Sequence, residues 1–251
     1  MQVTNRQILY NLLYEDGMEF AVCMPDSGAI AIQYHSKPLW MYAKDNLEES
    51  KLQDFFNNCI SKFKDKNKQI SGIVAPFKMS KFFEEIYGKK YPVIDRWELA
   101  AFFLPKPTGY VPQGQLALFD FDDVTMVSEW IIDFYREALK TAFNKNEGVK
   151  TAIALIGGKK LFGLKVNDLG IVAMGMINPL SYGMSRLNLI YTSPIYRGRG
   201  FGKDITAILA GKLQAEGSLP VLYARVKNTA AMSLYQSLGF IEAGRLIELR
   251  F

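Results

Sequence analysis

The stretch from Tyr191 to Lys203 constrains this chain more than any other. Apolar residues run up to Pro194, and a turn rich in glycine and arginine follows over residues 197–202. Apolar side chains at helical spacing then continue from Ile205 to Leu213. The start of a helix attracts anions through its unpaired amides and its dipole, and glycines let the backbone approach them closely. The stretch therefore predicts a strand, a loop and a helix that bind a phosphate or a diphosphate.

Two common phosphate-binding loops do not fit the spacing. In a P-loop, a glycine would replace Arg197, and a serine or threonine would replace Asp204 after Lys203. The dinucleotide fingerprint would need its third glycine at Lys203. The pattern that fits is Arg/Gln-x-x-Gly-x-Gly/Ala, which is formed by Arg197, Gly200 and Gly202.

A second motif lies beyond Gly217, a helix stop, and a buried strand expected over Leu219–Val226. It reads Asn-x-x-Ala-x-x-x-Tyr-x-x-x-Gly-Phe, from Asn228 through Tyr235 to Phe240. Taken alone, Asn228 is a helix N-cap and Tyr235 a packed aromatic residue. The order of loop, strand, asparagine and tyrosine is much more specific than any one of them.

Together these motifs resemble the acetyl-CoA site of the GNAT N-acetyltransferase superfamily, over about residues 120–251. The resemblance implies that the loop binds the pyrophosphate of acetyl-CoA and that the strand Leu189–Thr192 pairs with the pantetheine. It implies that Asn228 helps to hold the pantetheine and that Tyr235 lies near the thioester sulfur, as the candidate catalytic general acid. The expected cofactor-binding residues are Leu189, Ile190, Tyr191, Thr192, Arg197, Gly198, Arg199, Gly200, Phe201, Gly202, Lys203 and Asn228.

The resemblance also implies a reaction. A backbone amide, where the strand before the loop diverges from the next one, polarises the thioester carbonyl, and a neutral primary amine attacks it directly in a ternary complex. Many members carry a Glu on that strand, but here it offers only Asn188 and Tyr191. Glu129, Asp133 and Glu137 are better explained as a solvated helix face, so no general base is assigned. This favours an amine of low pKa or a proton relayed by water.

Two alternatives remain open at this point. One is an acyltransferase similar to glycine N-acyltransferase, which uses a longer or aromatic acyl-CoA. The other is a module that binds CoA without turnover. The acceptor is a small-molecule or peptide amine of unknown identity.

The C-terminal half is expected to be a mixed α/β sheet with the GNAT fold. A helix is expected within Asp120–Lys145, with Asp122 or Asp123 as its cap. The strands that should follow it are Leu161–Val166, Leu169–Ile177, Arg186–Thr192 and the terminal Ile241–Phe251.

The N-terminal half is expected to be a smaller α/β domain. Its clearest element is an amphipathic helix from Leu52 to Phe63, and its further expected elements are Glu19–Met24, Ala29–Tyr34, Ile70–Ala75, Ser80–Tyr87 and Trp97–Leu104. The order of these elements resembles a degenerate copy of the GNAT fold that lacks the Arg-x-x-Gly-x-Gly loop. In such an arrangement this domain would shape the acceptor pocket or the interface between the two domains. The alternative is an unrelated α/β domain. The predicted organisation is a degenerate GNAT-like N-terminal domain of residues 1–106, a linker rich in proline and glycine at 107–119, and a GNAT acetyltransferase domain of residues 120–251.

Composition excludes several other classes. The net charge of +5 permits an anionic ligand, but no nucleic-acid motif accompanies it. Cys23, Cys59 and the single His35 form no disulfide framework or metal site, so no metal is expected. Apolar runs are too short to cross a membrane and no export signal is visible, so a cytoplasmic location is expected. The terminal strand could pair with a second copy, which leaves the oligomeric state open.

Overall fold

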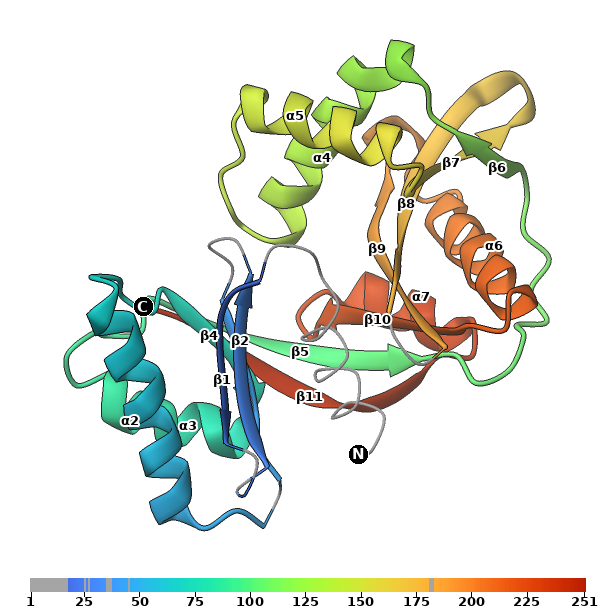
Figure 1. The fold of residues 1–251 in the computed structure, drawn as a ribbon. Helices are drawn as coiled ribbons and strands as arrows, with labels where there is room; N and C mark the ends of the chain where they lie inside the picture. The colour runs from blue at the N-terminus through green and yellow to red at the C-terminus, as the bar shows by residue number, and fades with distance from the viewer. Residues whose placement is uncertain (1–17, 25, 27, 35–37, 45, 181–182) are drawn as a thin grey trace. The chain divides into compact units, whose positions relative to one another are not determined.

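The fold is described from a computed structural model, which covers all residues except 1–17, 25, 27, 35–37, 45 and 181–182 (Figure 1). His35, and residues 25 and 27 between the expected elements Glu19–Met24 and Ala29–Tyr34, therefore lie outside the described residues. The chain divides into two compact units. The first contains residues 1–101, 224–227 and 242–251, and the second contains residues 102–223 and 228–241.

In the described part of the chain, the first unit is a mixed sheet with two helices. Its strand order is β1-β2-β3-β4-β11-β5. β1, β2 and β3 are antiparallel, β3 and β4 are parallel, and β4 and β11 are antiparallel. The elements are β1 (Met18–Met24), β2 (Ala29–Tyr34), β3 (Leu39–Tyr42), α2 (Glu49–Asp65), β4 (Gly72–Pro76), α3 (Phe77–Tyr87), β5 (Asp95–Phe103) and β11 (Ile241–Arg250).

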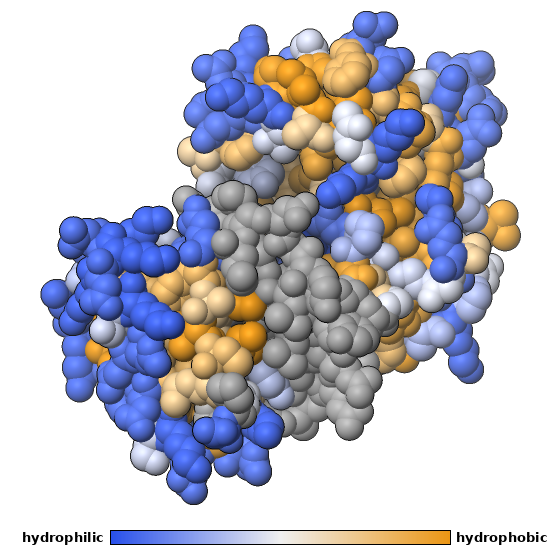
Figure 2. Space-filling view, in the orientation of Figure 1, coloured by the Kyte–Doolittle hydropathy of each residue, from blue (hydrophilic) through white to orange (hydrophobic). Residues whose placement is uncertain are grey.

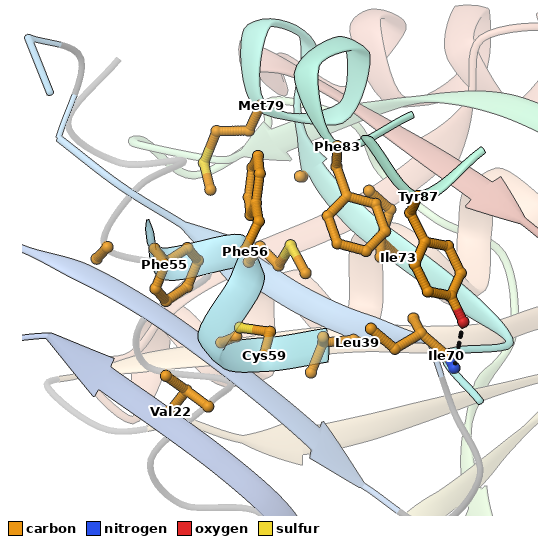
Figure 3. Packing of buried hydrophobic residues seen from close by; sticks show 14 of the residues in the cluster. Val22, Leu39, Phe55, Phe56, Cys59, Ile70, Ile73, Met79, Phe83 and Tyr87 are labelled. Atoms are coloured by element: carbon orange, nitrogen blue, oxygen red, sulfur yellow. Dashed lines mark hydrogen bonds between the residues drawn. The ribbon is translucent and has the colours of Figure 1, made fainter. Parts of the chain in front are cut away.

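The apolar stripe of α2 supplies the centre of this unit's core. Phe55, Phe56 and Cys59 are fully buried, and Phe56 packs edge-on against Phe83 with ring centroids 5.1 Å apart (Figure 3). The opposite face of α2 carries charged and polar residues, and the surface over it is hydrophilic in Figure 2. The spacing of apolar residues along this helix therefore determined which face it buries, and the predicted helix is confirmed.

The C-terminal strand belongs to this first unit, which differs from the expected boundary. β11 pairs with β4 from Leu246 to Arg250. Ile247 and Leu249 enter the core around α2 and α3, and the ring of Phe251 lies 5.0 Å from that of Tyr87. Burial of these apolar side chains accounts for the placement. No local pattern could have shown it, because the partner strand lies far away in the sequence.

The second unit is a sheet covered by helices on both faces. Its strand order is β10-β9-β8-β7-β6, and Figure 1 shows α4 and α5 on one side of β8 and β9 and α6 on the other. The strands are β6 (Gln115–Leu118), β7 (Leu161–Val166), β8 (Gly170–Pro179), β9 (Met184–Thr192) and β10 (Leu219–Arg225). The helices are α4 (Val124–Ala138), α5 (Lys145–Gly157), α6 (Phe201–Ala215) and α7 (Thr229–Ser237), with short 3-10 turns at Phe121–Asp123, Asn167–Leu169 and Pro194–Tyr196.

Three local features differ in part from the expectations. The helix expected within 120–145 is shorter; Asp123 occupies the N-cap position of α4 without a side-chain hydrogen bond, and Asp120 caps the 3-10 turn before it by accepting from the Asp122 amide at 2.9 Å. The expected linker contains β6, which pairs with β7. Helix α5 was not predicted, although the reciprocal cap formed by Asn144 and Glu147 marks its start.

None of the helices in the described part of the chain is long and apolar enough to cross a membrane.

Gly175 determines how closely α6 approaches the sheet. A Cβ atom at this position of β8 would lie 2.5 Å from Leu209 Cδ1 and 2.9 Å from Ile190 Cδ1. Leu209 is fully buried, so its side chain has little room to move away. The absent side chain therefore allows α6 to pack directly against β8 and β9.

We expect Gly175→Ala to lower the free energy of unfolding by about 1–2 kcal/mol, because the added methyl overpacks this contact. Urea unfolding followed by circular dichroism measures the change. The control is Gly211→Ala in α6, the helix that packs against Gly175, where an added Cβ meets nothing within 4 Å. That control should be neutral or slightly stabilising, since alanine favours a helix. Equal stabilities of the two variants would contradict the packing argument.

Candidate functional site

The glycine-rich turn ends at the first residue of α6. Gly198 and Gly200 have positive φ angles of 78° and 88°, which only glycine adopts readily. Gly200 is the N-cap of α6, and its carbonyl accepts from the amides of Lys203 and Asp204 at 2.8 and 3.0 Å. The first turn of the helix thus directs its amides outward, as an anion site requires.

The structure brings the loop and helix α7, which carries the second motif, together around one cavity of about 450 Å³. Thr192 and the loop form one wall, and the outward face of α7 forms the other. The lining residues are Thr192, Tyr196, Arg197, Gly198, Gly200, Phe201, Gly202, Lys203, Ala230, Ser233, Leu234 and Ser237. Seven of the residues expected from the sequence to bind a cofactor therefore share one concave surface.

Arg197 also has a structural role that the sequence did not show. Its Nε donates to the Thr192 carbonyl at 3.1 Å, and its guanidinium donates to Glu137 Oε2 at 2.8 Å. The same guanidinium lies 5.2 Å from the centroid of the Tyr191 ring. Arg197 thus joins the loop to β9 and α4. Arg199 is exposed, with its guanidinium 5.9 Å from the Tyr196 ring. A substitution of Arg199 therefore tests ligand binding more directly than one of Arg197, which would also remove the contacts to β9 and α4.

β9 diverges from β10 before it reaches the loop. Among the described residues, their parallel pairing covers only Met184–Arg186 with Leu219–Val221. On the other side, Met174 faces Tyr191 and Met176 faces Asn188, so Gly175 alone faces two residues of β9. Leu189 adopts a positive φ of 49° in this bulge. A bulge disrupts the hydrogen-bond ladder locally. Here the disruption of the β8–β9 ladder lies beside the point where β9 and β10 separate.

The two motif residues of α7 have local partners. The Asn228 side chain caps the helix by accepting from the Ala231 amide at 3.2 Å. Tyr235 is buried, with its ring 6.0 Å from Phe102 and 5.9 Å from Phe240. Neither residue is among those that line the cavity. Burial raises the pKa of Tyr235 to about 12, so its hydroxyl is protonated at neutral pH.

Asp133 and Glu137 support β9. The Tyr191 hydroxyl donates to Asp133 Oδ2 at 3.1 Å, and Asp133 also pairs with Arg136. Burial and the two nearby carboxylates raise the pKa of Tyr191 to about 12. These partners account for Asp133 and Glu137 without a catalytic role, and a general base remains unassigned.

Asp204 is a site residue that the sequence analysis missed. Its side chain is buried in the first turn of α6. Oδ1 accepts from the Tyr110 hydroxyl at 2.6 Å and from the Gln113 amide at 3.2 Å. The segment before β6 is therefore fastened to the helix that carries the loop. An acidic residue in the first turn was visible in the sequence, but its partners lie over 90 residues away.

We expect Tyr110→Phe to lower the free energy of unfolding by about 1–2 kcal/mol, because the buried carboxylate loses a donor. The hydrogen bond to Asp204 raises the pKa of Tyr110 to about 12. A raised pKa means that this stabilisation is present below about pH 10 and is lost as the pH rises towards 12. Urea unfolding at neutral and alkaline pH measures both effects. A variant as stable as the wild type would contradict the role of the bond.

The described residues contain no group of three or more His, Cys, Asp or Glu side chains that could hold a metal ion. The site is therefore built from backbone amides, glycines and cationic side chains.

Comparisons with known proteins agree with this geometry. Residues 162–247 match the family described as FR47-like protein. The chain is 33% identical over 87 residues to the N-alpha-acetyltransferase RimI of Mycobacterium tuberculosis. That match covers 35% of this chain and 52% of the relative, so the chain spans about half the length of the curated relative.

Solved structures show the fold over most of the chain. A GNAT-family acetyltransferase from Colwellia psychrerythraea has a TM-score of 0.61 at 13% identity, covering 89% of this chain and 81% of its own. A GCN5-related N-acetyltransferase from Sphaerobacter thermophilus has a TM-score of 0.63 at 16% identity, covering 92% and 80%. These structures share the fold of this chain, which is therefore the GNAT fold, and the loop, the divergent strands and the helix motif are similar to those expected from the sequence.

Proposed function

We propose that this protein is an acetyl-CoA-dependent N-acetyltransferase. The observation that carries the proposal is the single cavity between the glycine-rich loop and α7, beside the point where β9 diverges from β10. The loop amides and Arg199 bind the pyrophosphate. The pantetheine extends along β9 towards the bulge at Leu189, where the register of β9 with β8 shifts.

In the proposed reaction the amine nitrogen attacks the thioester carbonyl carbon. An amide donor in the bulge of β9 stabilises the developing oxyanion. The carbon–sulfur bond then breaks, the thiolate takes a proton, and the attacking nitrogen loses one. Tyr235 is the proposed donor to the thiolate because of its position in the α7 motif, and its hydroxyl is protonated at neutral pH. The general base remains unassigned.

The absence of an assigned base favours an acceptor of low pKa. Deprotonating an alkylamine with a pKa near 10.4 at pH 7 costs roughly 4–5 kcal/mol, whereas an α-amino group with a pKa near 8 costs only about 1.4 kcal/mol. RimI of Mycobacterium tuberculosis is named as an N-alpha-acetyltransferase. We therefore propose the α-amino group of a peptide or a small molecule as the acceptor, in the cytoplasm, where free thiols such as Cys23 and Cys59 persist.

We expect wild-type protein to bind acetyl-CoA in isothermal titration calorimetry and Arg199→Ala to bind it about three- to tenfold more weakly. An exposed guanidinium contributes a charge-assisted contact of this size to a phosphate. The control is Lys212→Ala, which removes one positive charge from the far end of α6 and should bind normally. Failure of the wild type to bind acetyl-CoA would refute the proposed function.

We expect Tyr235→Phe to lower kcat by about a hundredfold while the Kd for acetyl-CoA is unchanged, because a general acid acts only on the transition state. Thiol release with α-amino peptide acceptors measures kcat. Tyr135→Phe is the matched control, since Tyr135 is a tyrosine on α4 that stacks on Phe143 outside the cavity. An unchanged kcat in Tyr235→Phe would limit Tyr235 to packing.

Two further outcomes correspond to the remaining alternatives. Faster thiol release with a longer acyl-CoA than with acetyl-CoA would favour the acyltransferase related to glycine N-acyltransferase. Binding of acetyl-CoA without thiol release with any amine would favour a non-catalytic CoA-binding module.

A further inference from the structure

A second cavity of about 650 Å³ adjoins the first in the second unit. Lys203 and Ser237 line both cavities, so the two form one continuous surface beside the start of α6. The other walls come from the segment before β6 and from the end of α7. The lining residues are Pro105, Lys106, Pro107, Thr108, Gly109, Tyr110, Lys203, Ser237, Leu238, Gly239 and Ile241.

The side chains around this cavity carry positive charge without a counter-charge. Lys106 and Lys203 line it, and no acidic residue is among the lining residues. The carboxylate of Asp204 is nearby, but it accepts hydrogen bonds from the Tyr110 hydroxyl and the Gln113 amide. The ammonium group of Lys203 lies 4.4 Å from the centroid of the Tyr110 ring, which fixes its position at the border of the two cavities.

The wall that carries Lys106 is anchored at both ends. The Leu104 amide donates to the Pro220 carbonyl at 2.9 Å, and the Leu104 carbonyl accepts from Gln214 Nε2 at 3.1 Å. At the other end, Tyr110 is held by Asp204. Pro105 and Pro107 restrict the backbone between these anchors. A pre-ordered segment loses little conformational entropy when it binds a ligand.

We propose that Lys106 and Lys203 bind the 3′-phosphate of coenzyme A in this second cavity. The inference rests on the proposed function and extends it. Coenzyme A has two arms on its diphosphate: the pantetheine, and an adenosine that carries a 3′-phosphate. With the diphosphate at the loop and the pantetheine along β9, the adenosine arm needs a neighbouring space with cationic side chains. The second cavity supplies both, through a segment outside the loop and the α7 motif.

The test compares coenzyme A with 3′-dephospho-coenzyme A by isothermal titration calorimetry at low ionic strength. Wild-type protein should bind coenzyme A about five- to tenfold more tightly, because two lysines contact the additional phosphate. Lys106→Ala should reduce this ratio by about threefold, and Lys106→Glu should reduce it further. Lys106 is exposed, so both variants should fold normally. The control is Lys150→Ala on the exposed surface of α5, which lines neither cavity and should leave the ratio unchanged.

The outcomes separate this inference from the function on which it rests. If the wild type binds both ligands equally, the 3′-phosphate site is wrong while the acetyl-CoA site stands. If the ratio persists undiminished in Lys106→Glu, the phosphate binds elsewhere and the inference is also wrong. If neither ligand binds, the proposed function fails as well.

Discussion

The contact between α6 and the sheet at Gly175 positions most of the candidate site. Gly175 lacks a side chain, so Leu209 and Ile190 can occupy the space in front of it. The same residue faces the bulge in β9, where Leu189 takes its positive φ. One backbone position therefore lies both at the contact of α6 with the sheet and opposite the irregularity of β9. This is a packing constraint with a direct chemical consequence.

Charged groups then fix the loop to its surroundings. Arg197 connects the loop to Thr192 of β9 and Glu137 of α4, and Asp204 connects the start of α6 to the segment that contains Tyr110. The second of these bonds carries a buried charge, which is costly unless it is well satisfied. The loop is thus ordered before any ligand arrives, and binding need not supply that ordering energy.

The sequence was sufficient for features whose physics is local. The spacing of apolar residues predicted α2 and its buried face, and the glycine spacing predicted the turn before α6. The fold class followed from two motifs and was confirmed, and the comparisons support the resemblance to the superfamily. The individual roles given to Asn228 and Tyr235 stay predictions, since the structure shows them as a helix cap and a buried ring.

What the sequence did not show depends on distant partners. Nothing near Ile247 indicates that it completes a core built by α2 and α3, and nothing near Asp204 indicates that Tyr110 donates to it. Helix α5 was missed for another reason: its interior contains Gly148 and its apolar spacing is weak, although the cap at Asn144 was readable. Tertiary contacts decide such elements, and a single sequence does not reveal them.

The most direct test of the central claim is hydrogen–deuterium exchange of the wild-type protein with and without acetyl-CoA. The account predicts slower exchange in peptides that cover Leu189–Thr192 and Gly198–Asp204, because the ligand would accept hydrogen bonds from these amides. Peptides that cover α2, in the first unit, should exchange as before. Acetyl-CoA binding that left the first two peptides unchanged would contradict the account, because the ligand would then occupy a different surface.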